Sequence, residues 1–391
     1  GRLQEAGAVF GTKAGWERVD HLESGQPWRR SGRDQASYGW RRAPWFERVA
    51  AEGRAVRGRA GIIDLSSFGK IDVAGPGALS LLQRIAANDL DRPVGSVVYT
   101  PWCDERGGMV ADVTISRLGH NRFRVVTGAG FVTSDLAWLR WQRADAEDVT
   151  IREVSADVAT VGLWGPRARD ILAAVAHDAV DDEALPLRQA RPIRVGAAPV
   201  LAARISYAGE LGWELSTDAP WAVGVWDALR GAGADHGLAP FGYRALDALR
   251  MEKGYRYYSV DMTMLDTPFD AGLGAFVHLG KGPFIGREAL WAARDEAPDG
   301  PRRQLSTILV GDDERDLPLY GGEAVRVEGE VIGRLRSVAY GPTASRMVGY
   351  VYRAANLAEG ARLSVDVFDE WVPATLAPDV LIDPGGERMR G

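Results

Sequence analysis

An aspartate inside an apolar strand is the first residue of this 391-residue chain whose type and place suggest chemistry. In the stretch YTPWCDERGGMVADVTISRL, residues 99–118, Asp112 follows a Gly-Gly turn and has apolar neighbours. Strand alternation predicts one face that carries Val110, Asp112 and Thr114, and an opposite face that is wholly apolar. A buried carboxylate without a partner is costly, so we expect Asp112 to be paired or to meet a ligand.

A second acidic and phenolic group stands in SYAGELGWELS, residues 206–216. The pattern predicts a short hairpin with Tyr207 on one strand, Glu210 at the turn and Glu214 on the returning strand, so that Tyr207 and Glu214 face one cavity. Glu210 is interpreted as a turn acid that binds neighbouring amides. Together, Asp112 and Glu214 favour a ligand rich in N–H donors, because a hydrogen bond to a carboxylate contributes roughly 1.5–3 kcal/mol. A heterocycle such as an aminopterin offers such donors.

Other site chemistries find little support. Cys103 is the single cysteine, which excludes an intrachain disulfide, and the absence of a GxSxG motif or a nearby histidine favours a packing role for it. The run GKGPFIG, residues 280–286, lacks the pattern of a phosphate loop and is interpreted as a turn before a helix. The five histidines are scattered without zinc spacing, so we expect no metal site.

Composition points to an ordinary globular protein. Hydrophobic residues make up 46% and charged residues 26%, and the net charge of −6 argues against nucleic acid or an anionic membrane as partner. No uncharged apolar run approaches the roughly 18 residues of a membrane helix, and no signal segment opens the sequence. The prediction is therefore a cytoplasmic protein.

The elements that must position these side chains alternate irregularly between helices and antiparallel hairpins, which predicts the α+β class. Residues 1–44 are rich in Gly, Arg and Trp without periodicity and predict an irregular arm, whose tryptophans act as packing anchors. Residues 45–297 hold the helices and hairpins. After the charged run around 294–304, residues 298–391 consist of short β-runs, which predict a small barrel or sandwich.

Several of these stretches resemble the aminomethyltransferase family, which includes the T-protein of the glycine cleavage system. The resemblance is closest to the folate-binding half of dimethylglycine and sarcosine dehydrogenases and covers nearly the whole chain. The stretches that carry it are YTPWCDERGGMVADVTISRL, RVVTGAG, VGLWGPRARDIL, ISYAGELGWELS, YRALDALRMEKGYR, DTPFDAGLGAFVHLGKGPFIGREAL, VPATLAPDVLIDPGGERMR and the opening GAVFGTKAGWER.

The resemblance implies a three-lobed fold around a channel for tetrahydrofolate, with a C-terminal β-barrel. It implies that Asp112 matches the essential aspartate of the family, and that Tyr207 shares the catalytic region. Tyr99, Thr127 and Glu214, with Asp112 and Tyr207, match cofactor-contacting positions. The implied activity is transfer of a methyl or methylene carbon from a small methylated substrate to folate, and a separate flavoprotein oxidase is an implied partner.

Three departures from the family pattern bear on function. Leu246 stands where the glycine-cleavage branch has an arginine, Ala275 stands where relatives place an aromatic residue, and SVAYGPTASRMVGYV, residues 337–351, replaces a glycine-rich run. The sequence leaves open whether the product is methyl-folate or methylene-folate. It also leaves two alternatives to an independent enzyme, a non-catalytic folate-binding module and the folate-domain subunit of a flavin-dependent oxidase complex.

Overall fold

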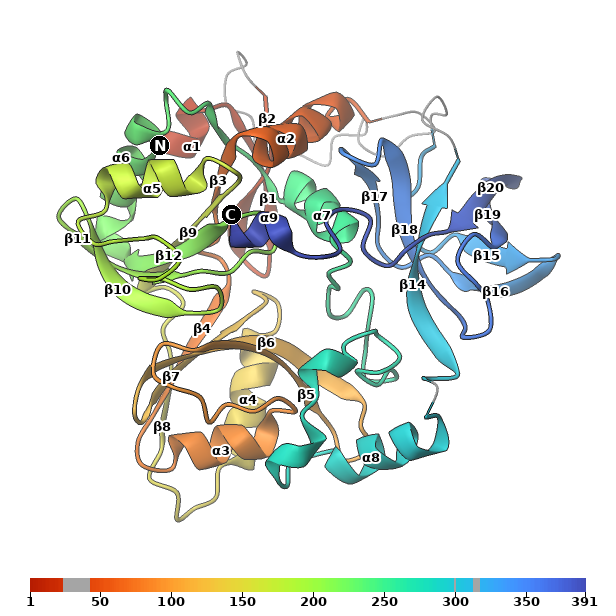
Figure 1. Cartoon of the computed structure of the whole chain (residues 1–391), viewed down its shortest axis with the longest axis horizontal. Helices are drawn as coiled ribbons and strands as arrows, with labels where there is room; N and C mark the ends of the chain where they lie inside the picture. The colour runs from red at the N-terminus through yellow and green to blue at the C-terminus, as the bar shows by residue number, and fades with distance from the viewer. Residues whose placement is uncertain (24–42, 299, 312–316) are drawn as a thin grey trace.

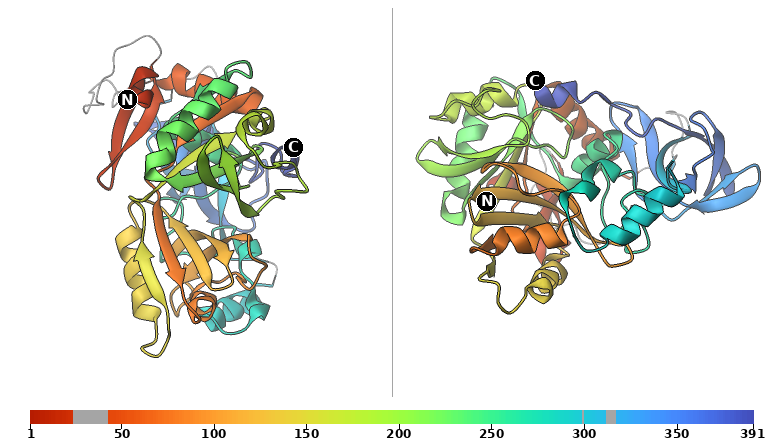
Figure 2. Two further views of the ribbon diagram at one scale, coloured as in Figure 1. Left: turned by 90° about the vertical axis from the view of Figure 1, so that its left-hand side faces the viewer. Right: turned by 60° about the horizontal axis from the view of Figure 1, so that its bottom comes forward.

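Three β-sheets divide the chain into three lobes, and helix α7 (Tyr243–Glu252) lies between the first and the third (Figures 1 and 2). The computed structural model describes residues 1–23, 43–298, 300–311 and 317–391. The sheets are antiparallel except where β3 pairs with β13. Helices lie beside these sheets, which confirms the predicted α+β class.

The six-stranded sheet, in the order β10-β11-β12-β9-β3-β13, forms the first lobe. Leu163, Trp213 and Leu215 pack on one face in a core shared with α5 and α6. Ile63 and Trp164 pack on the other face with α2 and α7. The elements are β3 (Ala60–Asp64), β9 (Val158–Trp164), β10 (Ala190–Val195), β11 (Ala198–Ala203), β12 (Gly212–Asp218), β13 (Leu238–Pro240), α2 (Phe46–Gly58), α5 (Ala168–Val175) and α6 (Ala222–Ala232).

The five-stranded sheet, in the order β5-β6-β7-β4-β8, forms the second lobe. Its apolar face packs Ile71, Val113 and Phe123 with residues of α3 and α4. The opposite face is therefore free to carry polar side chains. The elements are β4 (Gly69–Ala74), β5 (Val97–Cys103), β6 (Met109–Gly119), β7 (Arg122–Thr127), β8 (Thr150–Glu153), α3 (Ala78–Ile85), α4 (Val132–Gln142) and, nearby, α8 (Arg287–Glu296).

The third lobe is a curled, antiparallel seven-stranded sheet in the order β16-β15-β19-β20-β14-β18-β17. This lobe has a separate apolar core, to which Ile308, Val351 and Val365 belong. This lobe confirms the predicted all-β C-terminal region. Its strands are β14 (Arg303–Val310), β15 (Ala324–Val327), β16 (Glu330–Arg334), β17 (Val338–Gly341), β18 (Arg346–Ala354), β19 (Arg362–Val367) and β20 (Glu370–Leu376).

The N-terminal segment corrects one prediction. Instead of an irregular arm, the structure shows a short helix, α1 (Arg2–Glu5), and a hairpin of β1 (Ala8–Lys13) and β2 (Trp16–Leu22). The hairpin turns at Ala14 and Gly15, which both have positive φ angles of 50° and 85°. The carboxylate of Glu52 holds the hairpin end, because it accepts the Leu22 amide at 2.6 Å. Trp28 and Trp40 lie outside the described residues.

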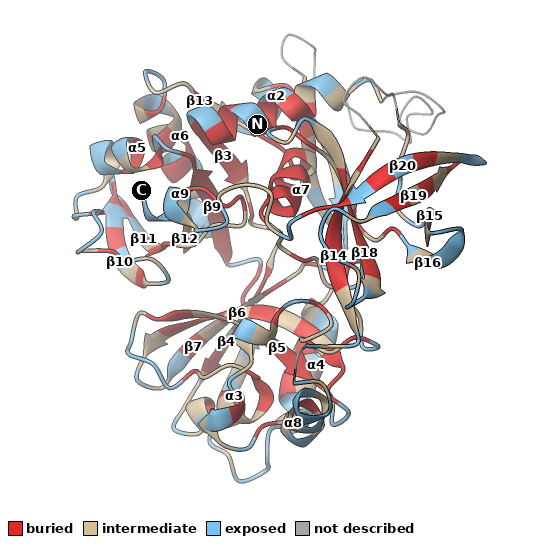
Figure 3. Ribbon diagram, turned by 45° about the vertical axis from the view of Figure 1, so that its right-hand side comes forward, coloured by how far each residue is buried: buried red, intermediate tan, exposed pale blue. Residues whose placement is uncertain are grey.

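Buried charges at α7 join the first and third lobes. The helix is buried along most of its length (Figure 3). Glu252 accepts hydrogen bonds from the amides of Thr343 and Ala344 at 2.7 and 2.9 Å, and from Arg57 of α2 at 3.2 Å. The 337–351 run, which departs from the family pattern, is therefore the hairpin by which the third lobe docks on α7.

A second buried pair reinforces this junction. Arg250 donates to Asp261 at 2.6 Å and also to the hydroxyl of Ser337. The same Asp261 accepts the amides of Tyr257 and Ser337 at 2.8 and 3.0 Å. Because α7, the 255–262 segment and Ser337, just before β17, share these bonds, the residues after α7 have a defined path. α9 (Glu387–Arg390) returns to the first lobe, where Arg388 contacts Glu210 at 2.8 Å.

Replacing Glu252 by Gln should destabilise the protein, because the change leaves the buried Arg57 guanidinium short of one carboxylate and weakens the two amide bonds of the third lobe. Loss of one member of a buried ion pair costs roughly 3–5 kcal/mol. Urea denaturation measures this loss. Glu359→Gln, at an exposed position of the third lobe, is the control. Equal stability of the two variants would contradict the proposed role of Glu252.

Candidate functional site

Asp112 lies on the polar face of β6. Burial alternates along the strand, with Ala111 and Val113 buried and Asp112 and Thr114 half-buried, as the sequence predicted. The hydroxyl of Tyr99, on the neighbouring strand β5, donates to Asp112 at 3.0 Å. The carboxylate therefore shares its strand with apolar residues because they point into the core on the other side of the sheet.

The surroundings of Asp112 favour a proton on its carboxyl group. Burial raises the pKa of Asp112 to about 6, the Tyr99 hydrogen bond opposes this shift, and the charges of Asp135 and Asp261 add to it. Burial also raises the pKa of Tyr99, and Asp112 adds to that rise, so Tyr99 remains a neutral donor. A carboxyl group that titrates near neutral pH can both accept and release a proton.

Glu214 lies on the half-buried face of β12, whereas its neighbours Trp213 and Leu215 belong to the core of the first lobe. In the register of the sheet, Glu214 lies beside Ala203 of β11 and Gly162 of β9. Ala203 carries only a methyl group, and Gly162 has no side chain. The sheet itself therefore offers the carboxylate no cover and no polar side chain at these two positions.

Charge interactions extend from Glu214 to the second lobe. Burial raises the pKa of Glu214 to about 7, and the ammonium group of Lys70 on β4 opposes the shift. Lys70 donates to the carbonyl oxygen of Ser66 at 2.8 Å. Burial lowers the pKa of Lys70 to about 8 against the opposing effect of Asp64 and Glu214. Within the described chain, the side chain of Glu214 has neither a hydrogen bond nor an ion pair, and this leaves its carboxylate oxygens available.

Tyr207 corrects a local prediction. It lies in the eight-residue connection, residues 204–211, between β11 and β12, since β11 ends at Ala203 and β12 begins at Gly212. Its hydroxyl donates to the carbonyl oxygen of Arg256 at 2.9 Å, and its ring stacks on Tyr255 with a centroid distance of 5.9 Å. Burial raises its pKa well above the usual value, and Asp112 contributes. The charge of Asp112 is thus felt at Tyr207, although Tyr207 is not a strand residue.

Thr127 has a different environment. It is buried at the end of β7, and its hydroxyl donates to Asp135 of α4 at 2.5 Å. Burial raises the pKa of Asp135 to about 6, and the Thr127 bond opposes the rise. The side chain of Thr127 therefore ties the sheet to α4, on the side of the sheet opposite to Asp112.

Four further residues of this region were missed from the sequence. Phe276 meets the ring of Tyr99 edge-on at 4.8 Å, next to the exposed Ala275, so an aromatic ring still lies beside the site. Tyr258 donates to the carbonyl oxygen of Met109 at 3.0 Å. Lys70 and Arg250 are the other two. Lys70 had a signal, since a lysine amid the apolar residues of FGKIDVAG raises the same question as Asp112.

The remaining candidates are structural. Glu210 is buried and pairs with Arg57 and Arg388, both at 2.8 Å, so the expected local amide contact of its carboxylate is wrong. Cys103 is buried in an apolar cluster, and burial raises the pKa of its thiol to about 12, which agrees with a packing role.

Leu246, which departs from the family pattern, packs in the core around α7. The described residues contain no group of three His, Cys, Asp or Glu side chains that could hold a metal ion.

Comparison with known proteins identifies the family. The GCVT N-terminal domain model matches residues 1–281, and the glycine cleavage T-protein C-terminal barrel domain model matches residues 303–383. The chain belongs to the aminomethyltransferase (GcvT) family. This confirms the resemblance inferred from the motifs. None of the described helices combines the length and the apolar character that a membrane crossing requires.

Individual relatives support the same branch. The chain is 36% identical over 391 residues to 4-methylaminobutanoate oxidase (formaldehyde-forming) of Paenarthrobacter nicotinovorans, covering 100% of this chain and 46% of that protein. It is 31% identical over 392 residues to human mitochondrial dimethylglycine dehydrogenase, covering 99% of this chain and 44% of the relative. The chain thus spans about half the length of these relatives. The aminomethyltransferase T of Bartonella henselae has the same fold, with a TM-score of 0.80 at 24% identity over 98% of this chain and 96% of that chain.

The raised pKa of Asp112 predicts that this residue lowers the free energy of unfolding at high pH. The unfolded carboxyl titrates near about pH 3.9. The raised pKa therefore contributes stability at low pH that is lost as the pH rises through about 6. Asp112→Asn should raise the free energy of unfolding by roughly 1–3 kcal/mol near pH 8, and by less near pH 5. Urea denaturation at both pH values tests this, with the exposed Asp145→Asn as control. A gain that does not depend on pH would contradict the assigned pKa.

Proposed function

We propose that the chain is a tetrahydrofolate-dependent one-carbon transferase, in which Asp112 and Glu214 hold the folate between the first and second lobes. The observation that supports it most directly is the state of these two carboxylates. Both lie on half-buried sheet faces where burial raises their pKa, and Glu214 has no partner in the described chain. A heterocycle with several N–H donors would satisfy both groups.

Asp112 is the proposed proton acceptor. When a ligand nitrogen forms a bond to carbon, its proton must leave, and a carboxylate whose pKa is about 6 can take it near neutral pH. Tyr99 fixes one carboxylate oxygen by its 3.0 Å hydrogen bond and leaves the other oxygen for the ligand. A positioned acid–base group contributes typically about 10²–10⁴-fold in rate.

Glu214 and Tyr207 are proposed to bind and orient the ligand. The Glu214 carboxylate would accept N–H groups of the heterocycle, with Lys70 favouring its ionised form. The hydroxyl of Tyr207 already donates to Arg256, so its ring and oxygen lone pairs are what it offers a ligand. Thr127, whose hydroxyl is bonded to Asp135, would contact the folate through its backbone.

The proposed carbon is at the oxidation level of formaldehyde. Bound tetrahydrofolate would supply two N–H groups that take up such a carbon as a methylene bridge, with release of water. The relative at 36% identity is named as formaldehyde-forming, and the chain spans 46% of it. We therefore propose that a flavoprotein oxidase, acting on a small methylated amine, generates the carbon that this chain accepts. Direct transfer of a methyl group would need an acid for the leaving group, and the residues around Asp112 supply no evident one.

The folate assignment predicts a split between binding and turnover. Asp112→Asn should keep the affinity for tetrahydrofolate within a few-fold of that of the wild type. The rate of methylene-folate formation from formaldehyde, after subtraction of the rate without protein, should fall by roughly 10²–10³-fold. Anaerobic calorimetry measures binding, and chromatography identifies the folate product. Asp145→Asn is the matched control. If wild-type protein binds tetrahydrofolate but does not accelerate product formation, the non-catalytic folate-binding alternative is the correct one.

Glu214 predicts the pH dependence of binding. A carboxylate that accepts N–H groups must be ionised, so affinity should fall as the pH drops below about 7, the pKa of Glu214. Glu214→Gln should bind tetrahydrofolate roughly 10–100-fold more weakly at pH 8, because a charged hydrogen bond is lost, and should lose most of this pH dependence. Calorimetric titrations of both proteins between about pH 6 and pH 8.5 test this. An unchanged pH profile in the variant would exclude Glu214 as the titrating group.

A further inference from the structure

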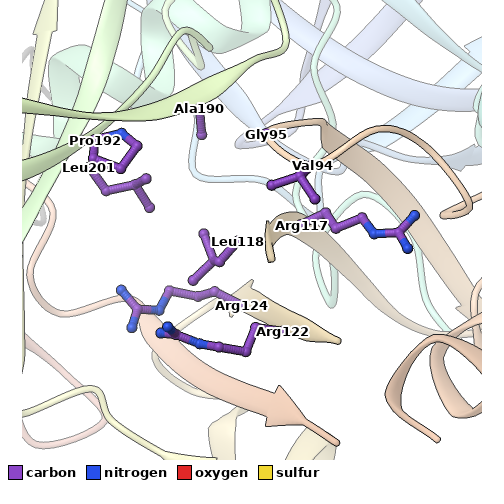
Figure 4. A pocket seen from close by; sticks show the side chains of 9 residues that line it. All are labelled: Val94, Gly95, Arg117, Leu118, Arg122, Arg124, Ala190, Pro192 and Leu201. Carbon is purple, nitrogen blue, oxygen red and sulfur yellow. The ribbon is translucent and has the colours of Figure 1, made fainter. Parts of the chain in front are cut away.

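A separate cleft lies where the first and second lobes meet, at the far end of the β6–β7 hairpin from Asp112. It encloses about 270 Å³. Figure 4 shows the side chains that line it. They come from the β6–β7 hairpin and the loop before β5 on one side, and from β10 and β11 on the other. The lining residues are Val94, Gly95, Arg117, Leu118, Arg122, Arg124, Ala190, Pro192 and Leu201.

The walls of this cleft have a defined position. The amide of Ala190 on β10 donates to the carbonyl oxygen of Gly95 at 2.7 Å. The amide of Gly95 in turn donates to the carbonyl oxygen of Arg117 at 2.8 Å. These bonds join the loop before β5 to strands of both lobes. Pro192 and Leu201 lie opposite each other in the register of β10 and β11 and form an apolar wall. The cleft is thus a recess built from both lobes.

Three arginines border this recess, and Figure 4 shows the guanidinium group of Arg117 directed away from it, unlike the side chains of Arg122 and Arg124. Arg124 binds Asp72 through two nitrogens at 2.7 and 3.0 Å, and Arg117 pairs with the exposed carboxylate of Asp91 at 3.0 Å. The side chain of Arg122 makes neither a hydrogen bond nor an ion pair within the described chain, and it is exposed. Arg122 and Arg124 are two residues apart on β7, so alternation places them on the same face, and Figure 4 shows their guanidinium groups near each other.

The unmatched positive charge at this recess comes from Arg122 and not from Arg117. The Arg117 guanidinium donates to Asp91 and to the carbonyl oxygens of Arg92 and His120, away from the recess. Across the sheet, Asp72 lies between Arg124 and Arg152 in the register, and its carboxylate pairs with Arg124, whereas Arg152 pairs with Asp157. Guanidinium groups are planar and bind carboxylate or phosphate through two hydrogen bonds at once. Like charges gathered in a partly apolar recess are stabilised when such an anion lies between them.

We propose that this cleft binds a small-molecule anion that carries carboxylate or phosphate groups, at a site separate from Asp112 and Glu214. The volume suits a compact molecule, and the apolar wall of Val94, Pro192 and Leu201 suits a short carbon skeleton. The recess is too small for a polymer, and the chain carries a net charge of −6, so nucleic acid is not the occupant we infer.

An occupant of this cleft would act on the folate region by charge. Arg124 is one of the charges that lower the pKa of Lys70, and Glu214 is one of those that raise it. An anion beside Arg124 would reduce the positive potential at Lys70 and favour its ammonium form, which in turn favours the ionised form of Glu214. The cleft also spans both lobes, so its occupant would bridge them.

Calorimetric titration with defined probes tests the cleft directly. The probes are inorganic phosphate, pyrophosphate, malonate and succinate, each at constant ionic strength and without folate. We expect at least one probe to bind, and Arg122→Glu to weaken it by roughly tenfold or more. Arg140→Glu, a charge-matched change at an exposed position of α4, should leave the affinity within about twofold. Binding of only the phosphates or only the dicarboxylates assigns the chemical class of the ligand.

Two results would overturn the proposal: no probe binds in the millimolar range, or Arg122→Glu and Arg140→Glu weaken binding equally. Thermal melts check that both variants fold, which is expected because both positions are exposed. Since the titrations contain no folate, their outcome is independent of the folate assignment. A chain that binds tetrahydrofolate but none of the anions retains the proposed function and loses only this site.

Discussion

The cost of holding two carboxylates on poorly hydrated sheet faces is the constraint on which the proposed site depends. Asp112 and Glu214 each raise their pKa toward neutrality because burial penalises their charge. A protein gains no stability from such groups, and a ligand that donates N–H bonds recovers what they cost. The two carboxylates belong to different lobes, so that ligand must bridge the lobes. The placement of the lobes therefore controls the site more than either sheet does alone.

Helix α7 fixes the first lobe against the third through buried ion pairs as well as apolar packing. Glu252 and Arg250 direct their charges to partners on α2, on the 255–262 segment and on the third lobe. Buried pairs add little net stability, but a wrong arrangement leaves a charge unpaired and is strongly penalised. Such pairs specify one arrangement. In this chain they fix the segment that carries Tyr255 and Tyr258 next to the candidate site.

The sequence predicted what short-range periodicity encodes. Asp112 could be placed on a polar strand face because side chains alternate with a period of two, and burial along β6 follows that pattern. The family motifs indicated the fold and supplied the proposed site residues. The hairpin at residues 8–22 was missed because its turn uses Ala14 at a positive φ angle, where glycine or asparagine is the usual signal. Tyr207 was misplaced because the chain leaves β11 four residues earlier than alternation suggested.

Long-range charge pairing was beyond sequence reasoning. Glu210 was interpreted as a local turn acid, yet its partners lie 153 and 178 residues away. Lys70 had a visible signal, but only the folded chain brings its charge near Glu214 and Arg124. This last relation connects the two ends of the junction between the lobes. The charge of Lys70 responds both to Glu214, at the proposed folate site, and to Arg124, at the cleft, so an anion bound in the cleft would favour the ionised form of Glu214.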